Sequence, residues 1–247
     1  MRHSKNLQTL WRTRFETFAG SHENDAGIAG WSPSGLDARF RHFKQRWETG
    51  HQGTDWLDAG CGAGTYSRFM TEKGAIVIGV DYSVPSLVKA QQRSSATMNW
   101  SAGDVTSLPF RSAYFDGVIC FGVTQTLDES YRVSAEILRI IKPGGEIWID
   151  ALNTNCLPHM FDRILKSFTK KPIQMRYEKP KKFIKIIKKA GGRNIHVHWL
   201  PILPQRLQRF QWIVETRPVV WLLQYVPFLG TLFSHAFVIS ANREKGA

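Results

Sequence analysis

Between residues 54 and 151, short apolar runs alternate with helical stretches, and this alternation restricts the fold more than any other feature of the chain. Strands are predicted at 55–58, 75–80, 98–100, 115–121 and 146–151. Helices are predicted between them at 65–73, 84–93 and 130–141. The last helix is followed by Lys142-Pro-Gly-Gly145, which is typical of a helix stop. Such alternation predicts βαβ units and a parallel sheet covered on both faces.

The pattern is less regular after residue 152. Residues 180–190 predict an amphipathic helix that carries five lysines on one side and Phe183, Ile184, Ile186, Ile187 and Ala190 on the other. Strands are predicted at 194–200 and 235–241. The segment between them is rich in Trp, Leu, Phe and Pro, and its 34 residues are too many for a plain hairpin loop.

The segment with the clearest chemical meaning is the glycine-rich turn at the end of the first strand. It reads Asp58-Ala-Gly-Cys-Gly-Ala-Gly64, and a helix follows directly. Glycines let the backbone turn sharply and approach a ligand, while the helix N-terminus offers free N–H groups. A glycine-rich turn alone is shared with dinucleotide-binding enzymes, or is simply a tight turn.

Three carboxylates fall where a nucleoside-like ligand needs them. Asp81 ends the second strand, where it can accept both hydroxyls of a ribose. Asp104 follows the third strand, where it can accept from an adenine amino group. Asp58 lies two residues before Gly60, where it would repel a pyrophosphate and attract an ammonium or sulfonium charge. The set therefore argues against a dinucleotide.

Taken together, these motifs resemble those of class I S-adenosylmethionine-dependent methyltransferases. The matching segments are Asp58–Gly64, Gly79-Val-Asp-Tyr-Ser83, Gly103-Asp104 with Leu108-Pro-Phe110, Phe115-Asp116, and Leu138-Arg-Ile-Ile-Lys-Pro-Gly-Gly145. The sequence is most similar to the subgroup that contains the ubiquinone and menaquinone biosynthesis enzymes and many natural-product methyltransferases. The resemblance covers about residues 54–152 and implies an α/β, Rossmann-like, seven-stranded, mostly parallel sheet with helices on both faces, an antiparallel last strand and an added helical cap.

The resemblance also assigns positions to the cofactor S-adenosylmethionine. The turn and Asp58 would hold its methionine part, Asp81 its ribose, and Asp104 with Val105 its adenine. The residues expected to bind the cofactor are Asp58, Ala59, Gly60, Cys61, Gly62, Gly64, Asp81, Tyr82, Ser83, Gly103, Asp104, Val105 and Phe121. Residues 1–50 are expected to form an N-terminal helical cap. Residues 51–247 would form the methyltransferase domain, with cap insertions at about 153–178 and 201–234.

Two departures from related families limit the substrate. The segment after the fourth strand, Phe121-Gly-Val-Thr-Gln-Thr126, lacks the Pro-Pro-aromatic motif of enzymes that methylate amino groups of bases or protein glutamine. It also lacks the histidine that quinone-pathway enzymes usually carry near Gln125. We expect a small or lipid-like acceptor, methylated on oxygen, with nitrogen or carbon as alternatives. The other hypotheses are an RNA-directed methyltransferase and a catalytically silent, cofactor-binding assembly partner.

No catalytic base stands out, because a sulfonium methyl is already activated and in-line placement does most of the work. His159 is a positional candidate, and a merely structural or exposed histidine is the alternative. Trp31 either closes over the pocket or fills a small core of the cap. Arg39 and Arg41 either pair with the cofactor carboxylate or, as charged helix residues usually are, are solvated. His196 and His198 have no third ligand nearby, so no metal is expected.

The charge is concentrated in one part of the chain. The sequence carries 33 Lys and Arg against 20 Asp and Glu, and residues 151–200 hold twelve of the former against Asp162 and Glu178. The five lysines of 180–190 form either a solvated face or a surface that attracts anionic lipid or an acidic substrate. With the apolar segment after residue 211, they would suit a membrane-surface contact or a lipid-linked substrate. That apolar segment alternatively lines a pocket. Three unpaired cysteines, no leader-like start and no long apolar span predict a cytoplasmic protein, with peripheral membrane attachment as the variant.

Overall fold

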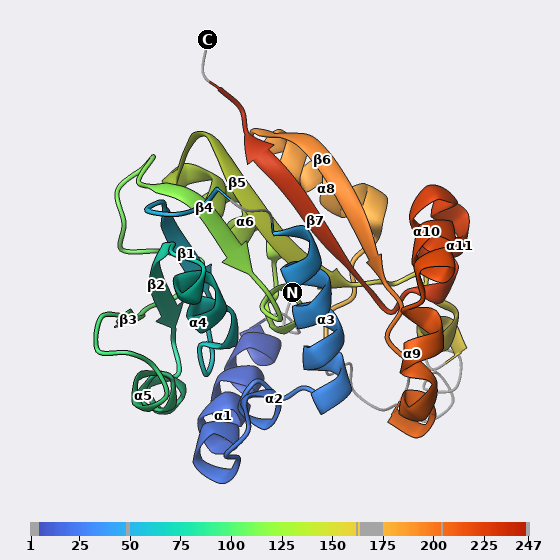
Figure 1. The fold of residues 1–247 in the computed structure, drawn as a ribbon, viewed down its shortest axis with the longest axis horizontal. Helices are drawn as coiled ribbons and strands as arrows, with labels where there is room; N and C mark the ends of the chain where they lie inside the picture. Colours follow the sequence, from blue (N-terminus) through green and yellow to red (C-terminus); the bar gives the residue numbers. More distant parts are fainter. Residues whose placement is uncertain (1–4, 48–49, 162, 164–174, 204, 246–247) are drawn as a thin grey trace.

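The computed structural model describes residues 5–47, 50–161, 163, 175–203 and 205–245. Its centre is a seven-stranded sheet with the order β3-β2-β1-β4-β5-β7-β6. The strands are β1 (Asp55–Ala59), β2 (Ile76–Asp81), β3 (Asn99–Ala102), β4 (Phe115–Cys120), β5 (Ile141–Leu152), β6 (Gly192–Leu200) and β7 (Ala236–Arg243). Figure 1 shows helices on both sides of this twisted sheet, so the predicted α/β architecture is confirmed.

Strands β1 to β5 pair in parallel, and β7 lies antiparallel between β5 and β6, so that β6 runs in the same direction as the first five. The predicted Rossmann-like order with an antiparallel last strand is therefore confirmed. The start of β5 differs from the prediction, because Ile141 already pairs with Phe115 and the next pair is Gly117 with Glu146. The Lys142–Gly145 segment is accommodated as an irregularity within the strand rather than as a separate turn.

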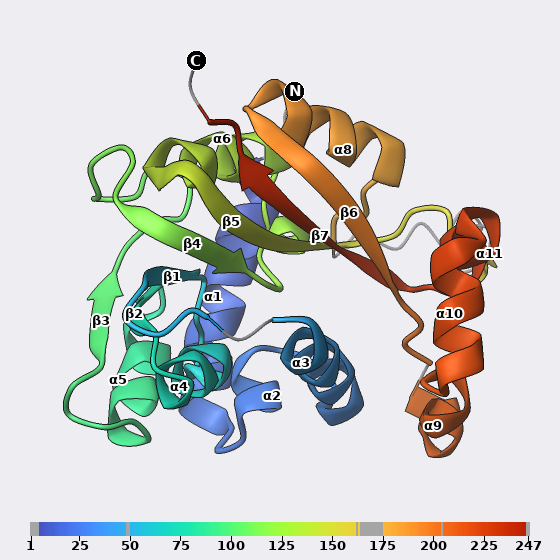
Figure 2. The same cartoon turned by 45° about the horizontal axis from the view of Figure 1, so that its top comes forward.

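The helices form the outer layers. They are α1 (Lys5–Ser21), α2 (Asp25–Ile28), α3 (Pro33–Arg46), α4 (Thr65–Glu72), α5 (Val84–Gln92), α6 (Ser130–Ile140), α8 (Pro180–Lys189), α9 (Gln211–Val214), α10 (Arg217–Tyr225) and α11 (Pro227–Phe233). Two 3₁₀ turns, η1 (Thr124–Thr126) and η2 (Gln205–Phe210), lie between these helices. Figure 2 shows α1 and α2 below the sheet and α9 to α11 together at one side, next to the edge strand β6.

Each face of the sheet buries its own apolar layer. On one face, Phe43 of α3 and Tyr66 and Phe69 of α4 pack against Trp56 and Trp148. The other face is covered by α6 and α8, whose buried side chains pack on the central strands. Burial of this continuous apolar surface is the main free-energy gain that holds the helices on the sheet.

The expected N-terminal cap of residues 1–50 contains two kinds of helix. α3 belongs to the sheet layer, since Phe43 and the C-cap residue Trp47 are buried in the core. α1 and α2 lie instead over the carboxyl ends of the parallel strands. Much of the insertion expected at 153–178 lies outside the described residues. The domain boundaries therefore stay a prediction.

Candidate functional site

A cavity of about 590 Å³ lies at the carboxyl ends of β1, β2 and β4. This edge of a parallel sheet is the usual ligand site of such folds, because the strand order reverses there. Ten of the thirteen predicted residues line the cavity: Asp58, Gly60, Cys61, Gly62, Asp81, Tyr82, Gly103, Asp104, Val105 and Phe121. Ala59 and Ser83 are buried beside it, and Gly64 begins α4.

The glycine turn is required by close packing as well as by backbone conformation. Gly60 and Gly64 have φ angles of +83° and +78°. A Cβ on Gly60 would lie 2.2 Å from Val123, and one on Gly64 would lie 2.4 Å from the ring of Trp100 in β3. A side chain at either position would therefore be strained and would also clash. Gly62 has φ +52° and would place a Cβ in open space.

Asp81 is positioned by the same turn. Its Oδ2 accepts a hydrogen bond of 2.9 Å from the amide of Gly62, and its Oδ1 accepts one of 2.8 Å from the amide of Ser83. Burial raises the pKa of this carboxyl, while these amide hydrogen bonds lower it. A carboxylate oxygen has a second lone pair, so both oxygens keep acceptor capacity for a ligand.

Asp58 is the most deeply buried carboxyl of the cavity wall, at 2% exposure. Its Oδ2 accepts a hydrogen bond of 2.6 Å from the hydroxyl of Ser67 in α4. Burial raises its pKa to about 7, and the charge of Asp81 adds to the rise. A positively charged ligand group at this position would restore the ionised form.

Asp104 differs from the other two carboxylates because it is exposed. Its Oδ1 accepts from the amide of Thr106 at 2.8 Å and from the hydroxyl of Thr106 at 2.7 Å. These contacts fix the turn after β3, beside the buried Val105. The pair therefore combines a polar rim with an apolar wall.

Residues of α1 that no sequence motif marks also line the same cavity, namely Gln8, Thr9, Trp11, Arg12 and Phe15. The Arg12 guanidinium lies 5.6 Å from the ring centre of Tyr82. Phe15 meets Tyr82 edge-on at 6.1 Å. The N-terminal helix thus closes the cavity from outside. An amphipathic helix remote in sequence gives no local signal of this role.

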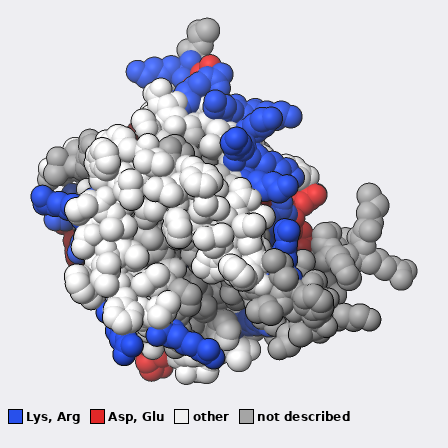
Figure 3. All heavy atoms as spheres, turned by 90° about the vertical axis from the view of Figure 1, so that its right-hand side faces the viewer, with Lys and Arg blue, Asp and Glu red and all other residues white. Residues whose placement is uncertain are grey.

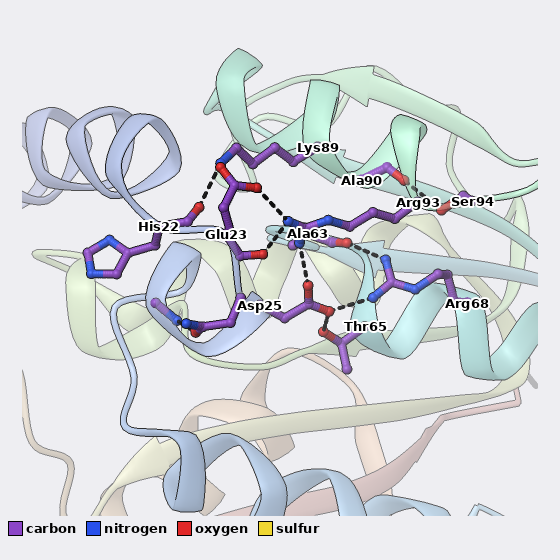
Figure 4. A network of polar contacts seen from close by, with 12 residues as sticks. His22, Glu23, Asp25, Ala63, Thr65, Arg68, Lys89, Ala90, Arg93 and Ser94 are labelled. Atoms are coloured by element: carbon purple, nitrogen blue, oxygen red, sulfur yellow. Dashed lines mark hydrogen bonds and ion pairs between the residues drawn. The ribbon is translucent and has the colours of Figure 1, made fainter.

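Asp25 at the start of α2 attaches the N-terminal helices to the glycine-turn side of the sheet (Figure 4). Its Oδ2 accepts from the hydroxyl of Thr65 and from Arg68 of α4, both at 2.5 Å. Its Oδ1 accepts from Arg93 at 2.7 Å. Arg93 also donates to the backbone carbonyl of Glu23. These charge-assisted bonds hold α2 against α4 and α5, at the wall of the cavity.

A second cavity of about 350 Å³ adjoins the first. Five residues line both: Trp11, Phe15, Ala29, Trp31 and Thr126. The remainder of its lining comes from segments that are far apart in the sequence, among them Leu152, His159, Met175, Tyr177, Ile202 and His235. Trp31 therefore stands at the junction of the two spaces, and it also packs on the apolar layer around Phe43.

Arg39 corrects an expectation of the sequence analysis. It is buried rather than solvated, at 6% exposure, and its Nε donates to Asp150 at 2.9 Å. Its guanidinium carbon lies 4.5 Å from the ring centre of Trp31. The amide of Gly122 donates to the other oxygen of Asp150 at 2.7 Å. Arg41 pairs with Glu215 at the surface.

The histidines separate into two groups. His159 and His235 line the second cavity, and His159 stacks on Tyr177 with ring centres 3.6 Å apart. Burial lowers the pKa of His235 to about 4, so its imidazole is neutral near pH 7. His198 instead stacks on Trp148 within the core. Within the described ranges, no three His, Cys, Asp or Glu side chains form a group that could hold a metal ion.

Comparison with known proteins places this geometry in a family. Residues 57–149 match the family model described as "Methyltransferase domain". The malonyl-[acyl-carrier protein] O-methyltransferase of Pseudescherichia vulneris is 26% identical over 71% of this chain and 80% of its own length. The demethylmenaquinone methyltransferase of Renibacterium salmoninarum is 37% identical over 37% of this chain and 38% of its own length.

Solved structures support the fold. A chain of the Haloferax volcanii complex between the Trm112 methyltransferase activator and a methyltransferase has a TM-score of 0.65, at 18% identity, covering 93% of this chain and 97% of its own. Haemonchus contortus phosphoethanolamine N-methyltransferase 2, solved with S-adenosyl-L-methionine, also gives 0.65, at 20% identity, covering 93% of this chain and 60% of its own.

The fold and the site define a class I S-adenosylmethionine-dependent methyltransferase. The relatives that the chain matches within that class include a malonyl-[acyl-carrier protein] O-methyltransferase and a demethylmenaquinone methyltransferase. The expectation drawn from the resemblance is confirmed at this level.

Proposed function

We propose that the first cavity binds S-adenosylmethionine and that the second holds a small or lipid-like acceptor for methylation on oxygen. The observation that carries this is the adjacency of the two cavities, which share Trp31 and Thr126. A methyl donor in one would thereby lie next to an acceptor in the other, and such placement supplies most of the rate enhancement in a displacement of this kind.

The residues of the first cavity fit the cofactor. Asp58 is a carboxyl whose pKa is raised to about 7 by burial, so a cationic ammonium or sulfonium group beside it would stabilise its ionised form. The open space beside Gly62 accommodates close approach to the turn. Asp81 has oxygens oriented by backbone amides for ribose hydroxyls. When bound, the cofactor supplies a methyl group on a positively charged sulfur.

Replacing Asp81 with Asn tests the cofactor assignment. Loss of the charged acceptor should weaken binding of S-adenosylhomocysteine by about 10- to 100-fold, since hydrogen bonds to charged groups contribute about 1.5–3 kcal/mol. Titration calorimetry measures the change. Asp37→Asn, on the exposed side of α3, is the matched control and should leave the affinity unchanged. Equal affinity in both variants would remove Asp81 from the site.

The second cavity is lined largely by apolar and aromatic side chains and suits an acceptor that contains a ring. Its walls include Leu152, Met175, Tyr177 and Ile202. Among its described lining residues, the one arginine is Arg39, whose charge is already balanced by Asp150. A neutral hydroxyl compound suits such a wall better than an anionic acid, because no uncompensated positive charge of the described lining faces it.

An imidazole of the second cavity can accept the hydroxyl proton as the oxygen attacks. His159, which lies against Tyr177, is the candidate, because burial lowers the pKa of His235 to about 4 and so disfavours its protonation. Trp11 and Phe15 close the junction and exclude water from it. The protein thus orients the acceptor oxygen, excludes solvent and takes up one proton.

Replacing Tyr177 with Ala tests the acceptor site, because Tyr177 lines the second cavity and not the first. The affinity for S-adenosylhomocysteine should change less than twofold, while kcat/KM for methylation of a prenylated hydroquinone should fall about tenfold, equivalent to about 1.4 kcal/mol. Transfer of tritiated methyl into the organic phase measures it, and malonyl-acyl-carrier protein serves as the acidic comparison. The exposed Tyr131→Ala variant is the control. Preferential methylation of the malonyl compound would refute the neutral acceptor.

A further inference from the structure

The helices α9 to α11 present an apolar surface to solvent. Trp212, Trp221, Tyr225 and Phe228 are 67%, 60%, 69% and 68% exposed. None of these four residues lines either of the two cavities described above. Large aromatic side chains gathered on one exposed surface are a mark of an interaction site.

The lysine-rich helix α8 adjoins this apolar surface. Phe183 of α8 packs on Phe237 of β7 at 5.9 Å, and Trp199 of β6 packs on the same ring at 6.1 Å. A Cβ on Gly230 of α11 would lie 2.3 Å from Trp199, so α11 is seated on the same cluster. α8, α10 and α11 therefore pack on the same face of the sheet, at its β6 edge, while α9 is tied to α3 through the pair of Glu215 with Arg41.

The prediction for α8 itself is confirmed. Phe183 and Ile187 are buried, while all five lysines are exposed, namely Lys181, Lys182, Lys185, Lys188 and Lys189. Within the described part of the chain, none of the five ammonium groups forms an ion pair with a carboxylate. They form a row of positive charge beside the apolar surface.

The charge around the apolar surface has one dominant sign. Residues 211–233 contain only Glu215 and Arg217 as charged residues. Glu215 is neutralised by Arg41 through two hydrogen bonds of 3.1 and 2.8 Å. Figure 3 views this side and shows a broad uncharged area bordered by blue side chains with few red ones. A basic border around exposed aromatics complements an anionic lipid surface.

We propose that α8 and α9–α11 dock this enzyme on an anionic lipid bilayer. The aromatic and aliphatic side chains of α9–α11 enter the headgroup region, and the α8 lysines face the lipid phosphates. Among the described residues, no helix is long and apolar enough to cross a membrane, so the contact is peripheral. The docking surface itself does not depend on the proposed acceptor.

The apolar surface lies next to the second cavity, so membrane docking would bring the acceptor site close to the bilayer. This step rests on the proposed function. Gln211, the first residue of α9, accepts from the amide of Leu203 at 2.9 Å and donates to the carbonyl of Pro201 at 2.9 Å. Leu203 and Ile202 line the second cavity. The exposed Trp212 follows directly, so a lipid-like acceptor leaving the bilayer would enter near the acceptor site.

Co-sedimentation of the full chain with vesicles tests the proposal. Vesicles of phosphatidylcholine that contain phosphatidylglycerol should pellet the protein at low salt, because an anionic surface attracts nearby lysines by about 1 kcal/mol each. Pure phosphatidylcholine vesicles should not, and binding should weaken as salt is raised. Brominated lipids should quench the tryptophan fluorescence on binding.

Two matched pairs of variants separate this surface from general basicity. Lys185→Glu/Lys189→Glu should weaken binding at least tenfold, whereas Lys73→Glu/Arg111→Glu, which reverses two exposed charges outside α8, should change it less than twofold. Trp212→Ala/Trp221→Ala should abolish the quenching, and the exposed Tyr131→Ala should retain it. All four variants should keep their affinity for S-adenosylhomocysteine, which reports folding separately.

The proposal would be overturned if Lys185→Glu/Lys189→Glu and Trp212→Ala/Trp221→Ala both bound vesicles as the wild type does. Failure of the wild type to bind the anionic vesicles at low salt would also overturn it. A stable dimer that buries Trp221 without vesicle binding would assign the surface to a second copy instead. Vesicle binding by a protein that fails to bind S-adenosylhomocysteine would refute the proposed function and leave the docking surface standing.

Discussion

Replacing Arg39 with Met should destabilise the protein by about 3–5 kcal/mol, because it leaves the carboxylate of Asp150 buried without its partner. Asp150 is fully buried, and Arg39 contributes the 2.9 Å contact to its Oδ2. The amide of Gly122 still reaches the other oxygen but carries no full charge. Urea unfolding at neutral pH followed by circular dichroism measures the loss.

Arg41 provides the comparison on the same helix. Its ion pair with Glu215 is exposed, at 46% and 29% for the two side chains. Arg41→Met should therefore cost no more than about 1 kcal/mol. The double variant Arg39→Met/Asp150→Asn should recover most of the stability lost in Arg39→Met. An equally small loss of stability in Arg39→Met and Arg41→Met would show that the amide of Gly122 is sufficient to stabilise the buried Asp150 carboxylate.

The parts of this structure that the sequence predicts are those whose signals are local. The strand that contains Asp58, the glycine turn and the following helix are adjacent in the sequence, and Gly60 and Gly64 alone predict a tight turn. Asp81 and Asp104 follow strands whose order was implied by the family resemblance. Ten predicted residues therefore meet around one cavity.

The second cavity could not be predicted, because its walls are brought together only by the fold. Trp11, Leu152, Tyr177 and His235 come from four segments, and none carries a recognisable motif. The expectation for Arg39 was wrong for the same reason, since its partner Asp150 lies 111 residues further along the chain, in strand β5. A charged residue in a helix is normally solvated, and only the opposing buried carboxylate reverses that expectation.

The apolar segment after residue 200 shows a further limit. Its composition indicated either a pocket wall or an interface, and sequence periodicity does not distinguish the two. Short helices pack by one side only, so Leu223 is buried while its neighbours Trp221 and Leu222 are exposed. Which side faces the sheet depends on Trp199 and Gly230, which are not adjacent to them in sequence.

Replacing Asp58 with Asn should stabilise the ligand-free protein at pH 8 and weaken cofactor binding. Burial raises the pKa of Asp58 from 3.8 to about 7. Between these two values the folded protein retains a proton that the unfolded chain has lost, so stability falls as pH rises through this window. The shift of about 3 pKa units corresponds to about 4 kcal/mol, which the neutral amide of the variant avoids.

Urea unfolding at pH 4.5 and pH 8 measures this effect. The Asp58 contribution lowers stability between pH 4.5 and pH 8, whereas the buried histidines, whose pKa values are lowered by burial, raise it over the same range. The change in stability from pH 4.5 to pH 8 should therefore be more favourable in Asp58→Asn than in the wild type, and the difference between the two proteins isolates the Asp58 contribution. Ser67 keeps an acceptor in the variant, because the amide oxygen replaces the carboxylate oxygen of the 2.6 Å hydrogen bond. Asp104→Asn, at an exposed carboxyl, is the control and should leave the pH dependence unchanged.

Ligand binding should respond with the opposite sign. A cationic ligand binds the ionised form of Asp58, so the affinity of the wild type for S-adenosylmethionine should fall about tenfold per pH unit below pH 7. Asp58→Asn should bind weakly at every pH and lack that slope. A variant that gains no stability at pH 8 but loses affinity would make Asp58 a ligand contact without a folding penalty. A variant that loses stability and keeps its affinity would make it a structural partner of Ser67. Only the combination of greater stability and weaker binding fits a carboxylate held buried for a cation.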